Sequence, residues 1–129
     1  MKKCDDLVKL SPLMIFMKGT PKIPKCGFVR QLLGVLENNK VEFAYYDIDY
    51  DQEMRHWVKV YSGRQTFPQI FIEGKLFGGL DDFKEVVEKG ELQNTLPSNC
   101  FKASAAERLE KYLNIHKDEK TLFINSFPF

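Results

Sequence analysis

The chain has 129 residues, 43% hydrophobic and 13% aromatic, with a formal net charge of +1. This composition is typical of a globular domain with a real core, and the near-zero charge argues against nucleic acid as the main partner. The longest apolar run, Leu13 to Met17, is far too short to span a membrane. The first residues of the sequence include the acids Asp5 and Asp6 and contain no apolar stretch, which argues against a signal or transit peptide.

Turn signals and apolar spacing predict seven elements. In chain order they are a strand at 13–17, a helix from Gly27 to the Asn38-Asn39 pair, a strand at 41–48, a helix at about 51–61, strands at 69–72 and 75–77 around a Glu73-Gly74 turn, and a helix after Gly78-Gly79. The order is that of an α/β domain with the thioredoxin-like fold, in which helices flank a central four-stranded mixed sheet.

This domain is predicted to occupy residues 1–96. The remainder, 97–129, is predicted to contain a linker helix followed by a strand at 121–124. Residues 14–21 align with residues 121–128 at a constant offset, so the remainder is interpreted as the possible start of a second, truncated repeat. The alternative is a C-terminal helix and strand that dock on the single domain.

Cys26 stands just before a predicted helix, and Lys18, Lys22 and Lys25 are close to it in sequence. The partial positive charge of a helix N-terminus and nearby ammonium groups both favour a thiolate, so a reactive thiol is predicted. Val29 occupies the position where a dithiol motif has its second cysteine. Cys26 therefore cannot close a Cys-x-x-Cys disulfide.

The other cysteines, Cys4 and Cys100, complete an odd and widely spaced set. Such spacing fits no zinc pattern and makes a disulfide scaffold improbable, which favours a reducing compartment, cytoplasmic or also nuclear. Cys4 and Cys100 are expected to be incidental. The alternative for Cys100 is the role of a resolving thiol.

Four motifs in register carry a family resemblance: Phe16-Met17-Lys18-Gly19-Thr20-Pro21, Pro24-Lys25-Cys26-Gly27-Phe28, Thr66-Phe67-Pro68-Gln69 and Gly78-Gly79-Leu80-Asp81. With them the chain resembles the monothiol glutaredoxins of the Cys-Gly-Phe-Ser type. The onset of a second repeat is similar to the multidomain thioredoxin/glutaredoxin-like (PICOT-like) proteins, in which glutaredoxin domains follow one another.

The resemblance implies a glutathione site with Cys26 as its catalytic thiol. Lys18 and Arg55 match the cations that bind the glycine carboxylate. The residues matched to the rest of the tripeptide are Phe67 and Pro68, with a cis bond between them, for the cysteinyl part, and Leu80 and Asp81 for the γ-glutamyl end.

The family also implies a [2Fe–2S] cluster shared by a homodimer, in which Cys26 of each protomer and two glutathiones supply four thiolates. The implied function is iron–sulfur cluster transfer or iron homeostasis, with BolA-like and iron–sulfur client proteins as partners. One alternative is a glutathione-dependent thiol–disulfide oxidoreductase, whose enzyme activity would be weak at most. Another is an interaction module with a degraded site.

Two departures from the family pattern bear on these expectations. Val29 replaces the family's serine and removes a hydroxyl that could hydrogen-bond the Cys26 sulfur, so a less stabilised thiolate and a more labile cluster are expected. Gly63-Arg64-Gln65 replaces the family's usual Asn-Trp-Pro, which removes an aromatic residue beside the glutathione and adds a cation.

Overall fold

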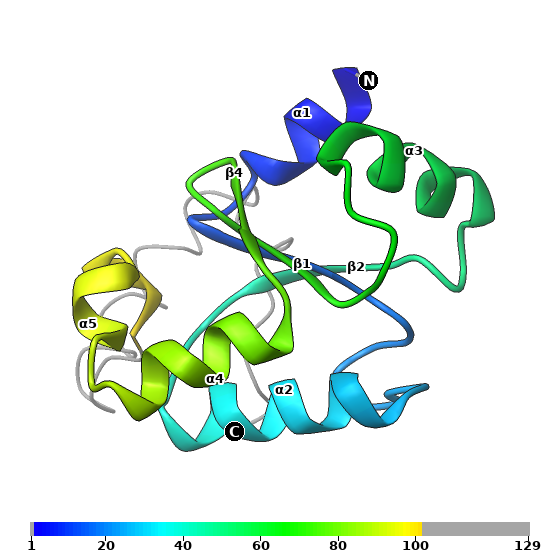
Figure 1. Ribbon diagram of the computed structural model, residues 1–129. Helices are drawn as coiled ribbons and strands as arrows, with labels where there is room; N and C mark the ends of the chain where they lie inside the picture. Colours follow the sequence, from blue (N-terminus) through cyan, green and yellow to red (C-terminus); the bar gives the residue numbers. More distant parts are fainter. Residues whose placement is uncertain (1, 102–129) are drawn as a thin grey trace, which may run out of the picture.

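The computed structural model describes residues 2–101. Its elements are α1 (Lys2–Val8), β1 (Leu13–Met17), α2 (Gly27–Asn38), β2 (Ala44–Asp47), α3 (Gln52–Ser62), β3 (Gln69–Ile72), β4 (Lys75–Gly78), α4 (Leu80–Glu88), α5 (Leu92–Thr95) and the 3₁₀ turn η1 (Ser98–Cys100) (Figure 1). The order from β1 to α4 is the one that the sequence predicts.

The four strands form one mixed sheet in the order β2-β1-β3-β4. β1 is parallel to β2 and antiparallel to β3, and β3 and β4 form the closing antiparallel hairpin. This sheet with its flanking helices confirms the predicted thioredoxin-like α/β fold.

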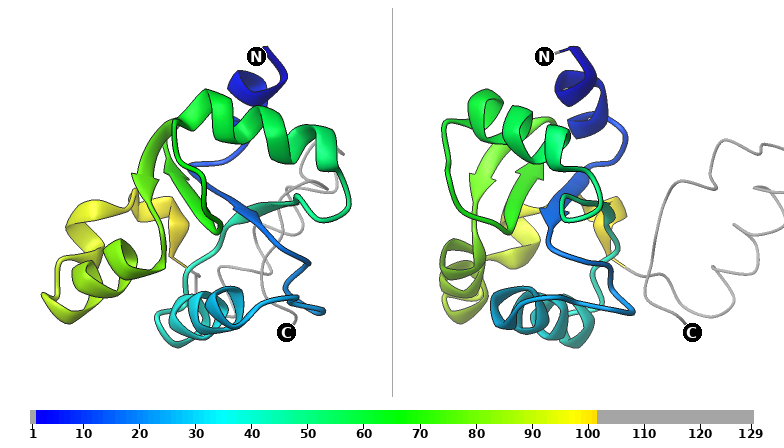
Figure 2. Two further views of the ribbon diagram at one scale, coloured as in Figure 1. Left: turned by 45° about the vertical axis from the view of Figure 1, so that its right-hand side comes forward. Right: turned by 90° about the vertical axis from the view of Figure 1, so that its right-hand side faces the viewer.

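The helices cover the two faces of the sheet in pairs, with α1 and α3 on one face and α2 and α4 on the other (Figures 1 and 2). Side chains of a strand alternate between faces, and β1 follows this rule with every residue buried. Leu13, Ile15 and Met17 join the core under α2 and α4, whereas Met14 and Phe16 join the core under α1 and α3. β1 therefore contributes to both cores, and the packing on its two faces positions its C-terminal end.

The ends of α2 and α3 follow from local chemistry. Cys26 has an extended backbone and is the residue just before α2. The buried residues of α2 include Val29, Leu32 and Leu36, which recur at helical spacing. Asp51 caps α3 by accepting the N–H of Met54 at 3.0 Å. α3 ends at Gly63, which has a left-handed φ of 75°.

Two predictions about the elements need correction. α1 and α5 are not anticipated by the sequence, because α1 buries only Cys4 and Val8 and α5 only Leu92, too few to show a helical period. The strand expected at 41–48 is shorter, because Val41 instead forms an isolated bridge with Phe101 and Glu42 donates its N–H to the carbonyl of Cys100. These contacts pack Cys100 and Phe101 onto the core.

The division expected at residue 96 stays a prediction, and the helix and strand expected beyond residue 101 lie outside the described residues. Within the described part of the chain, no helix has the length and apolar character to cross a membrane.

Candidate functional site

Cys26 lies where the chain returns from the C-terminal end of β1 and enters α2. Its backbone is extended (φ −150°, ψ 159°), and its Sγ accepts the backbone N–H of Val29 at 3.4 Å. The side chain is half-buried rather than enclosed. The sulfur thus lies at the N-terminus of α2, where backbone N–H groups have no partner within the helix.

The segment from Lys18 to Lys25 is a closed loop that precedes the cysteine. The carbonyl of Lys18 accepts the N–H of Lys25 at 3.0 Å, and Thr20 and Ile23 exchange backbone hydrogen bonds of 3.1 Å. Gly19 has a φ of +93°, and a Cβ there would overlap the Ile23 carbonyl. Glycine is required at position 19 for both reasons, and the closed loop brings Lys18 back beside Cys26.

A groove of about 400 Å³ opens beside the thiol. It is lined by Lys18, Cys26, Gly27, Phe28, Gln31, Arg55, Gln65, Thr66 and Phe67. Four of the predicted site residues thus come together from three separate parts of the sequence. Phe28, whose side chain is apolar, is 63% exposed at this groove.

The wall of the groove that contains Phe67 is fixed by Gln69. The Phe67–Pro68 bond is cis, which confirms the prediction. Gln69 is fully buried, and its Nε2 donates to the carbonyls of Arg64 at 2.8 Å and Thr66 at 3.2 Å. The sequence gives no hint of this role, because Gln69 begins an apolar strand and its side chain reaches back along the preceding loop.

The start of α4 lies outside the lining of this groove. Leu80 is 7% exposed and packs into the core, Asp81 is exposed, and neither lines the groove. The carboxylate of Asp82 accepts the N–H of Gly79 at 2.9 Å. No observation therefore tests the γ-glutamyl roles of Leu80 and Asp81, which stay predictions.

Arg64 brings its guanidinium to the same helix end. Its Nη1 lies 3.9 Å from the Asp82 carboxylate, and its side chain lies so close to Gly79 that a Cβ there would overlap it. The Nε of Arg64 is buried without a hydrogen-bond partner among the described residues. The cation that replaces the family's aromatic residue is thus placed beside the N-terminus of α4.

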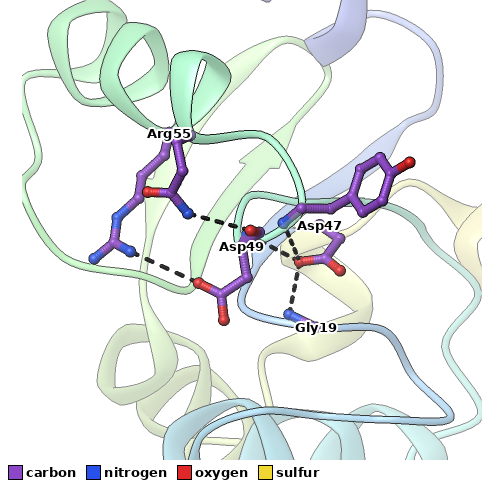
Figure 3. Close-up of polar contacts among 6 residues, drawn as sticks. Gly19, Asp47, Asp49 and Arg55 are labelled. Carbon is purple, nitrogen blue, oxygen red and sulfur yellow. Dashed lines mark hydrogen bonds and ion pairs between the residues drawn. The ribbon is translucent and has the colours of Figure 1, made fainter.

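Asp47, at the end of β2, joins two loops beside the groove and was not singled out from the sequence. Its Oδ1 accepts the N–H of Gly19 at 2.9 Å, of Asp49 at 2.9 Å and of Tyr50 at 3.4 Å (Figure 3). Asp49 in turn lies 3.7 Å from Arg55 in an ion pair. The sequence offers no clear signal for this role, because Asp47 falls inside the strand expected at 41–48 and is the last residue of β2.

The remaining cysteines are buried away from the groove. Burial raises the pKa of the Cys4 thiol. It raises that of Cys100 to about 11, with a smaller contribution from the charges of Glu73 and Glu42. The carbonyl of Cys100 accepts from Glu42, before β2 begins, whereas Cys26 follows the end of the parallel strand β1. The two thiols are thus at opposite ends of the sheet, which contradicts a resolving role for Cys100.

A second hollow, of about 370 Å³, lies at the far end of the sheet among Lys9, Pro12, Glu73 and Pro97. It contains none of the predicted site residues. Among residues 2–101, no group of three or more His, Cys, Asp or Glu side chains is arranged to hold a metal ion. The groove at Cys26 is therefore the better candidate for chemistry.

The sequence and structure have clear relatives. The glutaredoxin family model matches residues 13–77. Glutaredoxin 3 of Danio rerio is 44% identical over 108 residues, which are 84% of this chain and 32% of that protein. Monothiol glutaredoxin-S17 of Arabidopsis thaliana is 37% identical over 128 residues, 98% of this chain and 26% of that protein. The chain thus spans about a quarter to a third of the length of these two relatives.

Solved structures agree. The mature form of Trypanosoma brucei 1CGrx1 superimposes with a TM-score of 0.66 at 33% identity, covering 74% of this chain and 67% of that one. A buckwheat glutaredoxin, solved in complex with glutathione, has the same fold at 23% identity, with a TM-score of 0.68 and coverage of 78% and 91%. With this fold, these relatives and a single cysteine before α2, the chain belongs to the glutaredoxin family as a monothiol glutaredoxin domain.

Proposed function

We propose that this domain binds glutathione in the groove at Cys26 and, as a homodimer, holds a [2Fe–2S] cluster for transfer or for iron homeostasis. One observation carries the proposal: the Cys26 thiol lines a groove together with two cations, Lys18 and Arg55. Cys26 has no second cysteine within its own motif with which to form a disulfide. BolA-like and iron–sulfur client proteins are the partners proposed, in a reducing compartment, the cytoplasm or also the nucleus.

The groove suits an anionic tripeptide. Lys18 and Arg55 both line it, and opposite charges favour a carboxylate between them. The backbone of Phe67, beside the cis bond, is available to pair with the cysteinyl part of the ligand as a short added strand. Leu80 and Asp81 at the start of α4 are proposed for the γ-glutamyl end, where helix N–H groups favour a carboxylate.

The donor set fits a cluster shared between chains better than a metal site within one chain. Iron–sulfur clusters take thiolate ligands, and four are needed. The described residues offer one half-buried thiol, Cys26, whereas Cys4 and Cys100 are buried elsewhere. One thiolate from each of two protomers and two from bound glutathione complete the set. Bound there, the cluster would supply the iron and sulfide for delivery, while Lys18 and Arg55 hold the glutathione.

Anaerobic reconstitution with iron, sulfide and glutathione tests this function. The protein is expected to gain visible charge-transfer absorption and to elute as a dimer. Cys26→Ser should lose both properties, whereas Cys4→Ser and Cys100→Ser, which change only buried thiols, should keep them. A wild-type protein that stays colourless and monomeric would contradict cluster binding.

A glutathione-dependent oxidoreductase is the second candidate, favoured by the accessibility of Cys26. The Cys26 thiolate would attack the glutathione sulfur of a glutathionylated protein, forming a Cys26–glutathione disulfide and releasing the protein thiolate. A second glutathione thiolate would then attack that disulfide, giving oxidised glutathione and restoring Cys26. A glutathione-coupled deglutathionylation assay distinguishes this reaction from cluster delivery. If both assays are negative although glutathione still binds, the interaction-module alternative is favoured.

A further inference from the structure

The two cations of the groove differ in what surrounds them. Arg55 Nη1 lies 3.7 Å from Asp49 Oδ1, and both side chains are partly buried, at 31% and 26% exposure. Lys18 forms no ion pair or side-chain hydrogen bond within the described residues. Among residues 2–101, Lys18 is thus unpaired, whereas Arg55 already has an acidic partner.

We propose that Asp49 competes with the glycine carboxylate of glutathione for Arg55, so that Lys18 supplies most of the affinity for that carboxylate. The inference rests on the proposed glutathione site and adds a residue that sets its affinity. A guanidinium binds a carboxylate through two parallel N–H donors. An incoming carboxylate that reaches Arg55 therefore approaches a second negative charge, since the Asp49 oxygen already lies 3.7 Å from Nη1.

Asp49 is held in this position by its backbone. Its N–H donates to Asp47 Oδ1 at 2.9 Å, and its carbonyl accepts from Gln52 Nε2 at 3.1 Å. Figure 3 shows the Asp49 carboxylate between the loop fixed by Asp47 and the guanidinium of Arg55, with both contacts dashed. These two hydrogen bonds oppose movement of the Asp49 backbone away from Arg55.

The same contacts link the two cations. The Asp47 oxygen that accepts from Asp49 also accepts from Gly19, the residue after Lys18. Lys18 and the Asp49–Arg55 pair are thus tied to one carboxylate, which holds them on the same side of the groove. Asp49→Asn changes the side chain only and leaves the Asp49 N–H that donates to Asp47.

The opposite role for Asp49, that of holding Arg55 ready for the ligand, predicts the reverse result. If Asp49 only positions Arg55, neutralising Asp49 weakens glutathione binding and makes the Arg55 side chain less important. If Asp49 competes, neutralising it strengthens binding and makes Arg55 more important. A double-mutant cycle distinguishes the two roles by sign.

The experiment measures dissociation constants of the wild type, Asp49→Asn, Arg55→Gln and the double variant. The probes are reduced glutathione and its glycine-amide analogue, which lacks the carboxylate, both in anaerobic buffer of low ionic strength. Asp49→Asn should bind glutathione about two- to fivefold more tightly, the range set by partly exposed ion pairs, and bind the amide with unchanged affinity. Arg55→Gln should weaken glutathione binding more in the Asp49→Asn background than in the wild type.

Asp6→Asn is the matched control, since it makes the same charge change at an exposed position of α1. It should leave both affinities unchanged, and Asp49→Ala should reproduce the gain if the charge is the cause. Unchanged or weaker glutathione binding by Asp49→Asn overturns the inference, as does an equal gain for the amide. Absence of glutathione binding by every variant instead overturns the proposed function, together with the inference that rests on it.

Discussion

The backbone N–H of Val29 donates to Cys26 Sγ at 3.4 Å, while the Val29 side chain is completely buried in the core beneath α2. The residue that lacks the family's serine hydroxyl therefore still provides the sulfur with a donor, through its main chain. Its isopropyl group belongs to the same core cluster as Leu32, Leu36 and the strand residue Ile15. The thiol is supported by the geometry of the helix start more than by the side chain at position 29.

Val29→Ser is accordingly predicted to destabilise the fold. The change removes a fully buried apolar side chain and places a hydroxyl in the core, so the free energy of unfolding should fall by about 2 kcal/mol. Urea denaturation measures this loss. Val60→Ser, at a position that is 50% exposed on α3, is the control and should change stability little. A stability equal to that of the wild type would show that Val29 contributes little to the packing.

Gln69→Leu is predicted to loosen the loop before Phe67. Without the Nε2 donor, the carbonyls of Arg64 and Thr66 lose their hydrogen bonds, which should cost about 1–2 kcal/mol of unfolding free energy. Glutathione affinity should fall as well, because Thr66 and Phe67 line the groove. Denaturation and ligand titration check the two effects. Gln93→Leu, exposed on α5, is the matched control, and unaltered affinity in Gln69→Leu would contradict the role given to this side chain.

Alkylation should distinguish the three thiols. Burial raises the pKa of Cys4, and that of Cys100 to about 11, so both are protonated and shielded at neutral pH. Iodoacetamide is therefore expected to modify the native protein once, at Cys26, as mass spectrometry can show. Cys26→Ser should remain unmodified until urea exposes the other two thiols. Rapid labelling of Cys100 in the native state would contradict its burial.

Stability should decrease in acid through Asp51. Hydrogen bonds from the Met54 N–H and the Tyr46 hydroxyl hold the pKa of this carboxyl below its ordinary value of 3.8. A carboxyl with a lowered folded-state pKa stabilises the fold above pH 3.8, and this contribution is lost as the pH falls through the folded-state value. Asp51→Asn should therefore have a lower free energy of unfolding than the wild type at pH 6. Near pH 2.5 the two free energies should approach each other. Urea unfolding at both pH values measures them. A constant difference between the two proteins would contradict this assignment.

Local and periodic features of the fold were predictable. The Gln69–Ile72 strand and the helix from Gly27 to Asn38 were predicted within a residue, because their apolar spacing and their capping and turn residues agree. The cis bond before Pro68 followed from the motif at 66–69, and Lys18 and Arg55 line one groove, as the family resemblance implies. Element α1 did not, because seven residues with two buried side chains give no periodic signal.

The sequence by itself determined the kind of site, since one cysteine before a helix, without a second cysteine three residues later, allows only monothiol chemistry. The tertiary structure decided which side chains support the thiol and the groove and which charges face each other there. It placed Val29 in the core, turned Gln69 back to hold the loop before Phe67, and brought Asp49 against Arg55. Such contacts depend on where strand ends and loops meet in space, and a local pattern does not contain that information. The monothiol character of Cys26 is thus set by residues next to it in the sequence. The charges around the proposed ligand are set by residues, such as Asp49 and Arg55, that only the fold brings together.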